Sequence, residues 1–273
     1  MSDKPELEPR IVDARRLSAQ TRRDFVLFGA GALATAAGLF FVMPPGVKQR
    51  WARFSWLDSL EARRQKVMDG SLTFDDDVAE ALFSTSRRVR TYVRSDATEL
   101  RNNYAGRTPG PGYLPQWTLT LTGLRSGRDE VLTARDFARF ARHEQVTRLC
   151  CVEGWSAIAW WGGFRFSDLL RAFPPVDGTK WAGLQSSVNL SSAGNPDPYY
   201  VSIDMPTALH AQTLLATHQG GAPLTLAHGA PLRLVVPMKL GLKNIKAITK
   251  IAYSPTEPGD YWAERGYSKY DGL

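Results

Sequence analysis

The chain has 273 residues, of which 43% are hydrophobic and 22% are charged. This composition excludes disordered, collagen-like and short disulfide-stapled proteins, and the length suits one domain of about 200 residues with an additional segment. Lys and Arg total 34 against 27 Asp and Glu, a formal net charge of +7. The excess suits an anionic ligand, but the basic residues are dispersed, so the sequence does not favour nucleic-acid binding.

The N-terminal part of the sequence has the features of an export segment. Phe25–Met43 is 19 residues long and carries no charge, close to the length that spans a bilayer as a helix. Arg22 and Arg23 precede it and resemble the twin-arginine signal for export of folded proteins. The sequence therefore predicts a cytoplasmic segment at 1–24 and a transmembrane anchor or signal segment at 25–45.

Two alternatives to a retained anchor remain open. Small-residue cleavage motifs occur at 32–34 and 34–36, and cleavage there would release a soluble periplasmic protein. These motifs lie in the middle of the apolar run, with Leu39–Val42 still to follow, which favours an uncleaved anchor. A buried core helix is the other alternative, and Pro44 and Pro45 argue against it because they end the segment among polar residues.

The remaining chain reads as a helical linker followed by one domain. Helices are expected at 51–68 and 75–83, which makes 46–88 the linker and 89–273 the domain. Leu100–Pro115 is rich in Gly, Pro and Asn and is expected to be a binding loop. Further elements are expected in chain order as a strand at 116–121, a helix at 133–143, a strand at 146–152, a short helix capped by Ser167, a strand at 181–188, a helix at 206–216 and strands at 232–236 and 247–253. Strands outnumber helices without regular alternation, which predicts an α+β fold with mixed sheets.

Common catalytic patterns are weak in this sequence. The four histidines have neither H-x-H nor H-E-x-x-H spacing, so a histidine-based zinc site is not expected. Gly154–Ile158 lacks the second glycine of a serine-hydrolase nucleophile elbow. Cys150 and Cys151 are adjacent, and because neighbouring cysteines form only a strained ring, their interest lies in thiol chemistry.

Two segments contain the strongest candidates for metal and phosphate binding. Leu149–Ser156 places the two thiols at the end of a predicted strand, and a thiolate is a soft ligand for a transition metal. His228–Lys246 holds one arginine and three lysines among glycines, an arrangement that suits a phosphate group.

Together these segments resemble the sulfite oxidase family of molybdopterin enzymes, most closely its methionine sulfoxide reductase branch. That branch reads C-V-E-x-W-S and then G-A-P-x-R-L-V-V-P-x-K-x-G-x-K-x-I-K, and both runs occur here in order. The resemblance extends from Val89 to the C-terminus. It implies the sulfite oxidase fold and a bound molybdenum–molybdopterin cofactor.

The resemblance also implies roles for individual residues. Cys151 takes the place of the molybdenum ligand, whereas Cys150 is expected to be an inert thiol. The residues implied to contact the cofactor are Asn102, Ala105, Gly106, Ser186, His228, Arg233, Asn244, Ile245 and Lys246. Trp155 is a candidate for the cofactor pocket, and Tyr200 and His210 are candidates for a substrate channel.

The implied function is oxygen-atom transfer on a small sulfoxide, N-oxide or sulfur compound in the periplasm. Electrons would be exchanged with a haem protein, either a membrane b-type or a soluble c-type cytochrome. Sulfite is disfavoured because Glu153–Ser156 stands where sulfite oxidases carry arginines for an anionic substrate. The alternative is a cofactor-binding or scaffold subunit of a membrane redox complex that has lost turnover.

Overall fold

The computed structural model describes residues 70, 74, 76–80, 82–102, 109–190 and 197–271. The predicted anchor at 25–45 and the predicted helix at 51–68 lie outside this part of the chain, as do Ala105 and Gly106. Residues 76–80 and 82 are helical, within the predicted helix at 75–83. Across the described residues, we find no helix with the length and hydropathy needed to cross a membrane.

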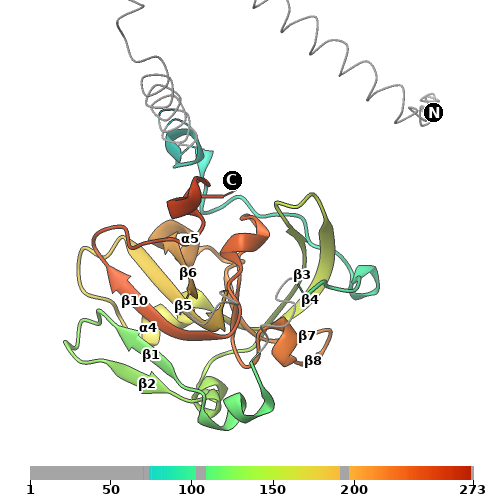
Figure 1. Cartoon of the computed structure of the whole chain (residues 1–273), viewed down its shortest axis with the longest axis horizontal. Helices are drawn as coiled ribbons and strands as arrows, with labels where there is room; N and C mark the ends of the chain where they lie inside the picture. The colour runs from blue at the N-terminus through green and yellow to red at the C-terminus, as the bar shows by residue number, and fades with distance from the viewer. Residues whose placement is uncertain are drawn as a thin grey trace, which may run out of the picture. The chain divides into compact units, whose positions relative to one another are not determined.

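One five-stranded sheet forms the left part of the domain in Figure 1. Its strands, in spatial order, are β2 (Glu130–Leu132), β1 (Leu119–Thr122), β10 (Ile248–Ser254), β5 (Trp181–Asn189) and β6 (Pro198–Asp204). β1 and β10 are parallel, and the other neighbours are antiparallel. β6 therefore forms one edge of the sheet.

A second sheet lies beside the first, on the right in Figure 1. It contains β3 (His143–Cys150), β4 (Ser156–Arg165), β7 (Leu214–Gln219) and β8 (Ala222–Pro223), with β9 (Arg233–Val235) also paired to β7. β3 and β4 form an antiparallel hairpin whose last pair is Cys150 with Ser156. The two candidate site segments, Leu149–Ser156 and His228–Lys246, thus belong to this sheet or to the chain that leaves it.

In the part of the chain that the structure describes, helices are few and short, which confirms the predicted α+β fold with mixed sheets. Between residues 84 and 271, the α-helices of the described chain are α4 (Phe166–Ala172) and α5 (Met205–Leu209). Short 3-10 helices are η1 (Arg94–Asp96), η2 (Pro111–Gln116), η3 (Ala134–Arg139), η4 (Leu226–His228), η5 (Gly241–Lys243) and η6 (Ala263–Arg265).

Three predicted helices need correction. The short helix expected to be capped by Ser167 is α4, but its N-cap is Arg165 without a side-chain cap, and Ser167 lies within its first turn. The helix expected at 206–216 ends at Leu209, because the backbone turns extended at His210 and Leu214 begins strand β7. The helix expected at 133–143 is only the 3-10 turn η3, and His143 already belongs to β3. The predicted capping box at its start is present, since Asp136 accepts the Thr133 backbone N–H at 2.7 Å.

The largest hydrophobic core joins the first sheet to α4 and to parts of the second sheet. Its fully buried members include Leu121 of β1, Leu184 of β5, Val201 of β6, Ile251 of β10 and Leu234 of β9. A smaller cluster around Trp161 lies under β3, β4 and β7. Because β9 contributes to both clusters through Leu234 and Val235, the chain that follows it is anchored between the two sheets.

Candidate functional site

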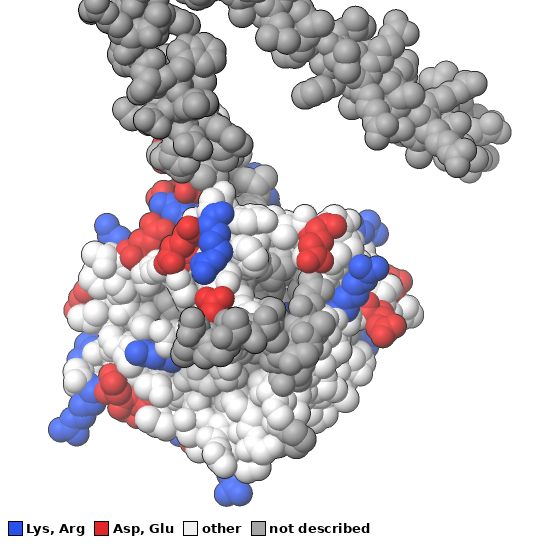
Figure 2. All heavy atoms as spheres, in the orientation of Figure 1, with Lys and Arg blue, Asp and Glu red and all other residues white. Residues whose placement is uncertain are grey.

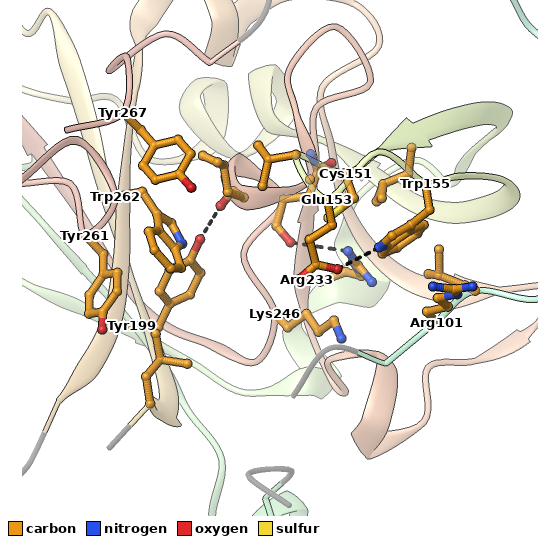
Figure 3. A pocket seen from close by; sticks show the side chains of 17 residues that line it. Arg101, Cys151, Glu153, Trp155, Tyr199, Arg233, Lys246, Tyr261, Trp262 and Tyr267 are labelled. Carbon is orange, nitrogen blue, oxygen red and sulfur yellow. Dashed lines mark hydrogen bonds between the residues drawn. The ribbon is translucent and has the colours of Figure 1, made fainter. Parts of the chain in front are cut away.

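A cavity of about 390 Å³ lies where the β3–β4 turn, the chain after β9 and the chain after β10 converge. Figure 3 shows its lining side chains. The lining consists of Leu100, Arg101, Leu149, Cys151, Val152, Glu153, Trp155, Leu190, Tyr199, Arg233, Gly241, Leu242, Asn244, Lys246, Tyr261, Trp262 and Tyr267. The residues come from distant parts of the sequence, and one wall is basic whereas the other is aromatic.

The turn between β3 and β4 places Cys151 in the cavity. The Cys151 N–H donates to the Trp155 carbonyl at 2.9 Å, and Gly154 supplies the positive φ of +83° that this tight turn requires. Successive side chains alternate at the strand end, so Cys150 is exposed while Cys151 is half-buried and faces the cavity. A Cβ on Gly241 would stand 3.3 Å from the Cys150 carbonyl oxygen, so glycine allows the chain after β9 to pass close to this turn.

Arg233 is buried beside the cavity, with 1% of its surface exposed. Its Nη1 donates to the His228 carbonyl at 3.2 Å and its Nη2 donates to the Asn244 carbonyl at 3.3 Å. The guanidinium also lies 4.6 Å from the ring centre of Trp161. The planar fork thus joins the loop before β9 to the loop after it while keeping a positive charge at the cavity wall.

Lys246 supplies a second cation on the same wall. Its Nζ donates to Asn102 Oδ1 and to the Ala227 carbonyl, each at 3.1 Å. Burial, with a smaller contribution from Arg233, lowers the pKa of Lys246 to about 7. An anionic group in the cavity would restore the charged form, so this wall suits a phosphate.

Asn244 orders the loop between these two cations. Its Oδ1 accepts the Val236 N–H at 2.8 Å, and its Nδ2 donates to the Leu240 carbonyl at 3.0 Å. Both groups of the amide are therefore used within the protein, and Asn244 shapes the cavity floor.

One carboxylate and a cluster of aromatic rings complete the cavity. Glu153 accepts a hydrogen bond from Trp155 Nε1 at 2.9 Å, next to Cys151 in Figure 3. Across the cavity lie Tyr199, Tyr261, Trp262 and Tyr267, hereafter the aromatic wall. Trp262 meets the rings of Tyr261 and Tyr267 edge to face at 5.3 and 5.4 Å. These contacts pack the rings against one another and give this side of the cavity an apolar surface.

The cavity brings together five of the residues chosen from the sequence, and three more lie just behind it. Cys151, Trp155, Arg233, Asn244 and Lys246 line the cavity. Asn102 contacts Lys246 directly, and Ser186 Oγ donates to the Lys246 carbonyl at 2.7 Å. His228 offers its carbonyl to Arg233, while its ring Nε2 donates to the Leu100 carbonyl at 2.9 Å.

Three chosen residues lie outside the lining. The Tyr200 hydroxyl donates to the Glu264 carboxylate, and this bond raises the Tyr200 pKa. His210 is 1% exposed, with Nε2 donating to the Arg87 carbonyl at 2.9 Å. Ile245 is fully buried in the core. His210 and Ile245 are thus buried in the fold, whereas the Tyr200 hydroxyl is held in an exposed hydrogen bond, and none of the three lines the cavity that contains Cys151.

Several lining residues are not among those chosen from the sequence. Glu153 was inside the quoted C-V-E-x-W-S run and could have been found there. Tyr199 neighbours the chosen Tyr200, and because side chains alternate along β6, only one of the two faces the cavity. Trp262 and Tyr267 belong to no motif, and only the folded chain brings them to the site.

The chemistry of the cavity fits a molybdopterin cofactor. A pterin dithiolene supplies sulfur ligands to molybdenum, so the protein must supply one further soft ligand and a binding site for the phosphate. Cys151 provides the thiol, and Arg233 with Lys246 provides two buried cations. Charges elsewhere are mixed: on the face seen in Figure 2, the described Lys and Arg residues are interspersed with Asp and Glu.

Comparison with known proteins finds relatives in sequence and a similar solved structure. A protein from Azospira oryzae, the protein-methionine-sulfoxide reductase subunit YedZ1 by name, is 38% identical over 154 residues, which cover 56% of this chain and 55% of that protein. The protein-methionine-sulfoxide reductase catalytic subunit MsrP of Campylobacter jejuni is 27% identical over 257 residues, or 91% of this chain and 78% of that protein. The sulfane dehydrogenase SoxCD of Paracoccus pantotrophus superposes with a TM-score of 0.46 at 19% identity, over 63% of this chain and 46% of that chain.

The chain thus spans about half the length of the first of these relatives. Residues 106–262 match the family described as the oxidoreductase molybdopterin binding domain. The match covers more than half of the chain and includes Cys151, Arg233 and Lys246. The protein therefore belongs to the molybdopterin-binding oxidoreductases of the sulfite oxidase family, as its two motifs predicted.

Proposed function

We propose that this protein reduces a sulfoxide by oxygen-atom transfer, with N-oxides or other small sulfur compounds as further substrates of the same site. The observation that carries this proposal is the single cavity in which Cys151 and Glu153 face the aromatic wall while Arg233 and Lys246 form the basic side. The names of the relatives from Azospira oryzae and Campylobacter jejuni support a sulfoxide as the substrate class.

Each side of the cavity has a distinct task in this proposal. Cys151 would be the protein ligand to molybdenum, and Arg233 and Lys246 would hold the phosphate of the pterin. Bound molybdenum supplies the two-electron oxygen exchange, and the protein supplies binding, orientation and electrostatics. Asn244 keeps the two cations in place by fixing the loop between them.

Reduction of a sulfoxide to a sulfide consumes two electrons and two protons and releases water. Glu153 is the carboxylate among the lining residues, and it can pass a proton toward the sulfoxide oxygen. Trp155 fixes this carboxylate by donating from Nε1 at 2.9 Å. The aromatic wall receives the apolar substituents of the substrate, because sulfur and methyl groups pack favourably on aromatic rings.

The experiment is a steady-state assay of the purified holoenzyme with a reduced viologen dye as electron donor. We expect turnover of peptide methionine sulfoxide and of dimethyl sulfoxide. Glu153→Gln should lower kcat by about a hundredfold, within the range for general acid catalysis. Glu144→Gln is the matched control, because Glu144 binds Arg94, Arg142 and Trp160 outside the cavity. A holoenzyme that binds molybdenum but does not cycle with any donor or acceptor would instead support a scaffold subunit.

We further propose that the protein works in the periplasm, anchored by residues 25–45, and receives electrons from a haem protein. The apolar run and the preceding Arg22 and Arg23 support this location. Replacing both arginines by lysine should leave cofactor-loaded protein in the cytoplasm, as measured by cell fractionation. Normal export of the double variant would contradict the route, and a mature N-terminus after Ala34 or Ala36 would contradict the anchor.

A further inference from the structure

A buried ion pair lies directly behind two sides of the cavity. Lys243 Nζ is 2.6 Å from Asp260 Oδ2, and both side chains are 1% exposed. Lys243 ends η5 between the lining residues Leu242 and Asn244, and Asp260 immediately precedes the aromatic wall. Neither partner is among the 17 lining residues. The pair therefore connects the loop at 241–246 to the aromatic wall from behind.

The same pair also closes an edge of the first sheet. Ser202 lies in the middle of β6, the edge strand. Its carbonyl accepts from Lys243 Nζ at 3.1 Å, and its N–H donates to Asp260 Oδ2 at 2.9 Å. The ion pair thus occupies the place of a neighbouring strand, and β6 supports both sides of the cavity through it.

Asp260 extends this connection into the aromatic wall. Its second oxygen, Oδ1, accepts the backbone N–H groups of Trp262 and Ala263, each at 3.2 Å. One carboxylate therefore orders the start of η6 and holds Lys243 at the same time. Buried ion pairs often add little to stability relative to apolar residues of the same size. A role in fixing geometry accounts better for this pair than a role in stability alone.

We propose that Lys243 and Asp260 are positioning residues that set the width of the cavity between the cofactor-binding loop, residues 241–246, and the aromatic wall. A substrate that packs on Trp262 is then bound beside Cys151 in a cavity of fixed width. The kinetic consequence of this spacing rests on the proposed sulfoxide reduction. The mechanical consequence, that both sides move together, does not.

The test combines hydrogen exchange with kinetics on the full chain carrying Asp260→Asn. Asparagine has the same shape and keeps an acceptor for the η6 backbone, but it removes the charge that binds Lys243. By mass spectrometry, the amides of 240–246 and of 261–267 should both exchange about tenfold faster, while the β3–β4 hairpin is unchanged. With peptide methionine sulfoxide, KM should rise about tenfold and kcat per bound molybdenum should change by less than about threefold.

Two further variants make the outcome decisive. Asp168→Asn is the control, because Asp168 pairs with His143 and Arg171 away from the cavity, and it should alter neither segment nor KM. The double variant Lys243→Gln, Asp260→Asn removes both charges of the pair, so neither partner is left charged without the other, and it tests the proposal even if the single variant does not fold. It should also loosen both segments.

The proposal is overturned if only one of the two segments exchanges faster, if exchange rises throughout the domain, or if KM stays unchanged in a variant that loosens both. A wild-type enzyme without any sulfoxide turnover would contradict the proposed function instead. The exchange experiment would still decide in that case whether the pair joins the two sides of the cavity.

Discussion

Replacing Lys246 by methionine should remove the pH dependence of cofactor binding. The ammonium is buried against Asn102 and the Ala227 carbonyl, and its pKa of about 7 means that the amine becomes neutral above neutral pH. The second pKa of a phosphate monoester is about 6, so the cofactor phosphate is fully charged from pH 7 upward. Binding above pH 7 must therefore protonate Lys246.

The free-energy cost of protonating Lys246 sets the size of the change in cofactor affinity with pH. Each pH unit above the pKa costs about 1.4 kcal/mol, a factor of about ten in affinity. The wild type should therefore bind the cofactor up to about a hundredfold more weakly at pH 9 than at pH 7. Lys246→Met loses a charge-assisted contact worth about 1.5 to 3 kcal/mol, so at pH 7 it should bind about ten- to a hundredfold more weakly. It has no proton to take up, so its affinity should not change between pH 7 and pH 9.

The assay is the molybdenum and pterin content per chain after dialysis of purified holoprotein at pH 7, 8 and 9. Lys180→Met is the control, since Lys180 is exposed and lies outside the cavity lining, and it should behave as the wild type. Calorimetry of cofactor binding at pH 8 in two buffers should detect proton uptake by the wild type. Equal retention of the cofactor by the wild type at pH 7 and pH 9 would refute this reasoning. The same pH dependence of cofactor retention in Lys246→Met as in the wild type would also refute it.

Two further predictions concern the fold around the site. Gly229 has a φ of +98°, and a Cβ there would stand 2.7 Å from the Lys246 Cβ, so Gly229→Ala should lower both thermal stability and molybdenum content. Gly127→Ala is the control for backbone strain alone, because φ is +69° with open space around it; it should lower stability by about 1 kcal/mol and leave molybdenum content unchanged. Burial raises the pKa of Asp271 to about 7, whereas the unfolded chain loses this proton near pH 4. The stability that the proton on Asp271 contributes is thus lost as pH rises from about 4 to 7. Asp271→Asn should therefore be more stable than the wild type at pH 8 by up to about 4 kcal/mol, and it should be no more stable than the wild type at pH 4. Equal urea unfolding of the two at pH 8 would contradict the shifted pKa.

The sequence was most informative where one face of a strand is buried. The strands expected at 116–121, 181–188 and 247–253 correspond to β1, β5 and β10 with small shifts at their ends. Strand β4 was missed because apolar residues such as Ile158 and Trp160 also occupy its half-buried face, so its hydrophobic pattern does not alternate. The chain leading into β7 was read as a helix because Ala, Leu and Gln favour helix locally, and tertiary pairing with β4 overrides that preference.

The basic wall and the thiol could be found from sequence because each is compact in the chain. Cys151 stands at a strand end, and Arg233 and Lys246 lie 13 residues apart around one loop. The aromatic wall could not be found in this way, since Tyr199 and Trp262 are 63 residues apart and meet only through the fold. The ion pair behind the cavity likewise depends on β6, which places Ser202 between its partners.

The central claim is that Cys151 holds molybdenum in this cavity. The most direct measurement is X-ray absorption at the molybdenum edge of the purified protein, comparing the wild type with Cys150→Ser and Cys151→Ser. The wild type should contain about one molybdenum per chain, as one cofactor per cavity requires. Cys151→Ser should have one sulfur neighbour fewer and lack activity, while Cys150→Ser should match the wild type because its side chain is exposed. A wild type without molybdenum, or the same sulfur count in Cys151→Ser, would contradict the account.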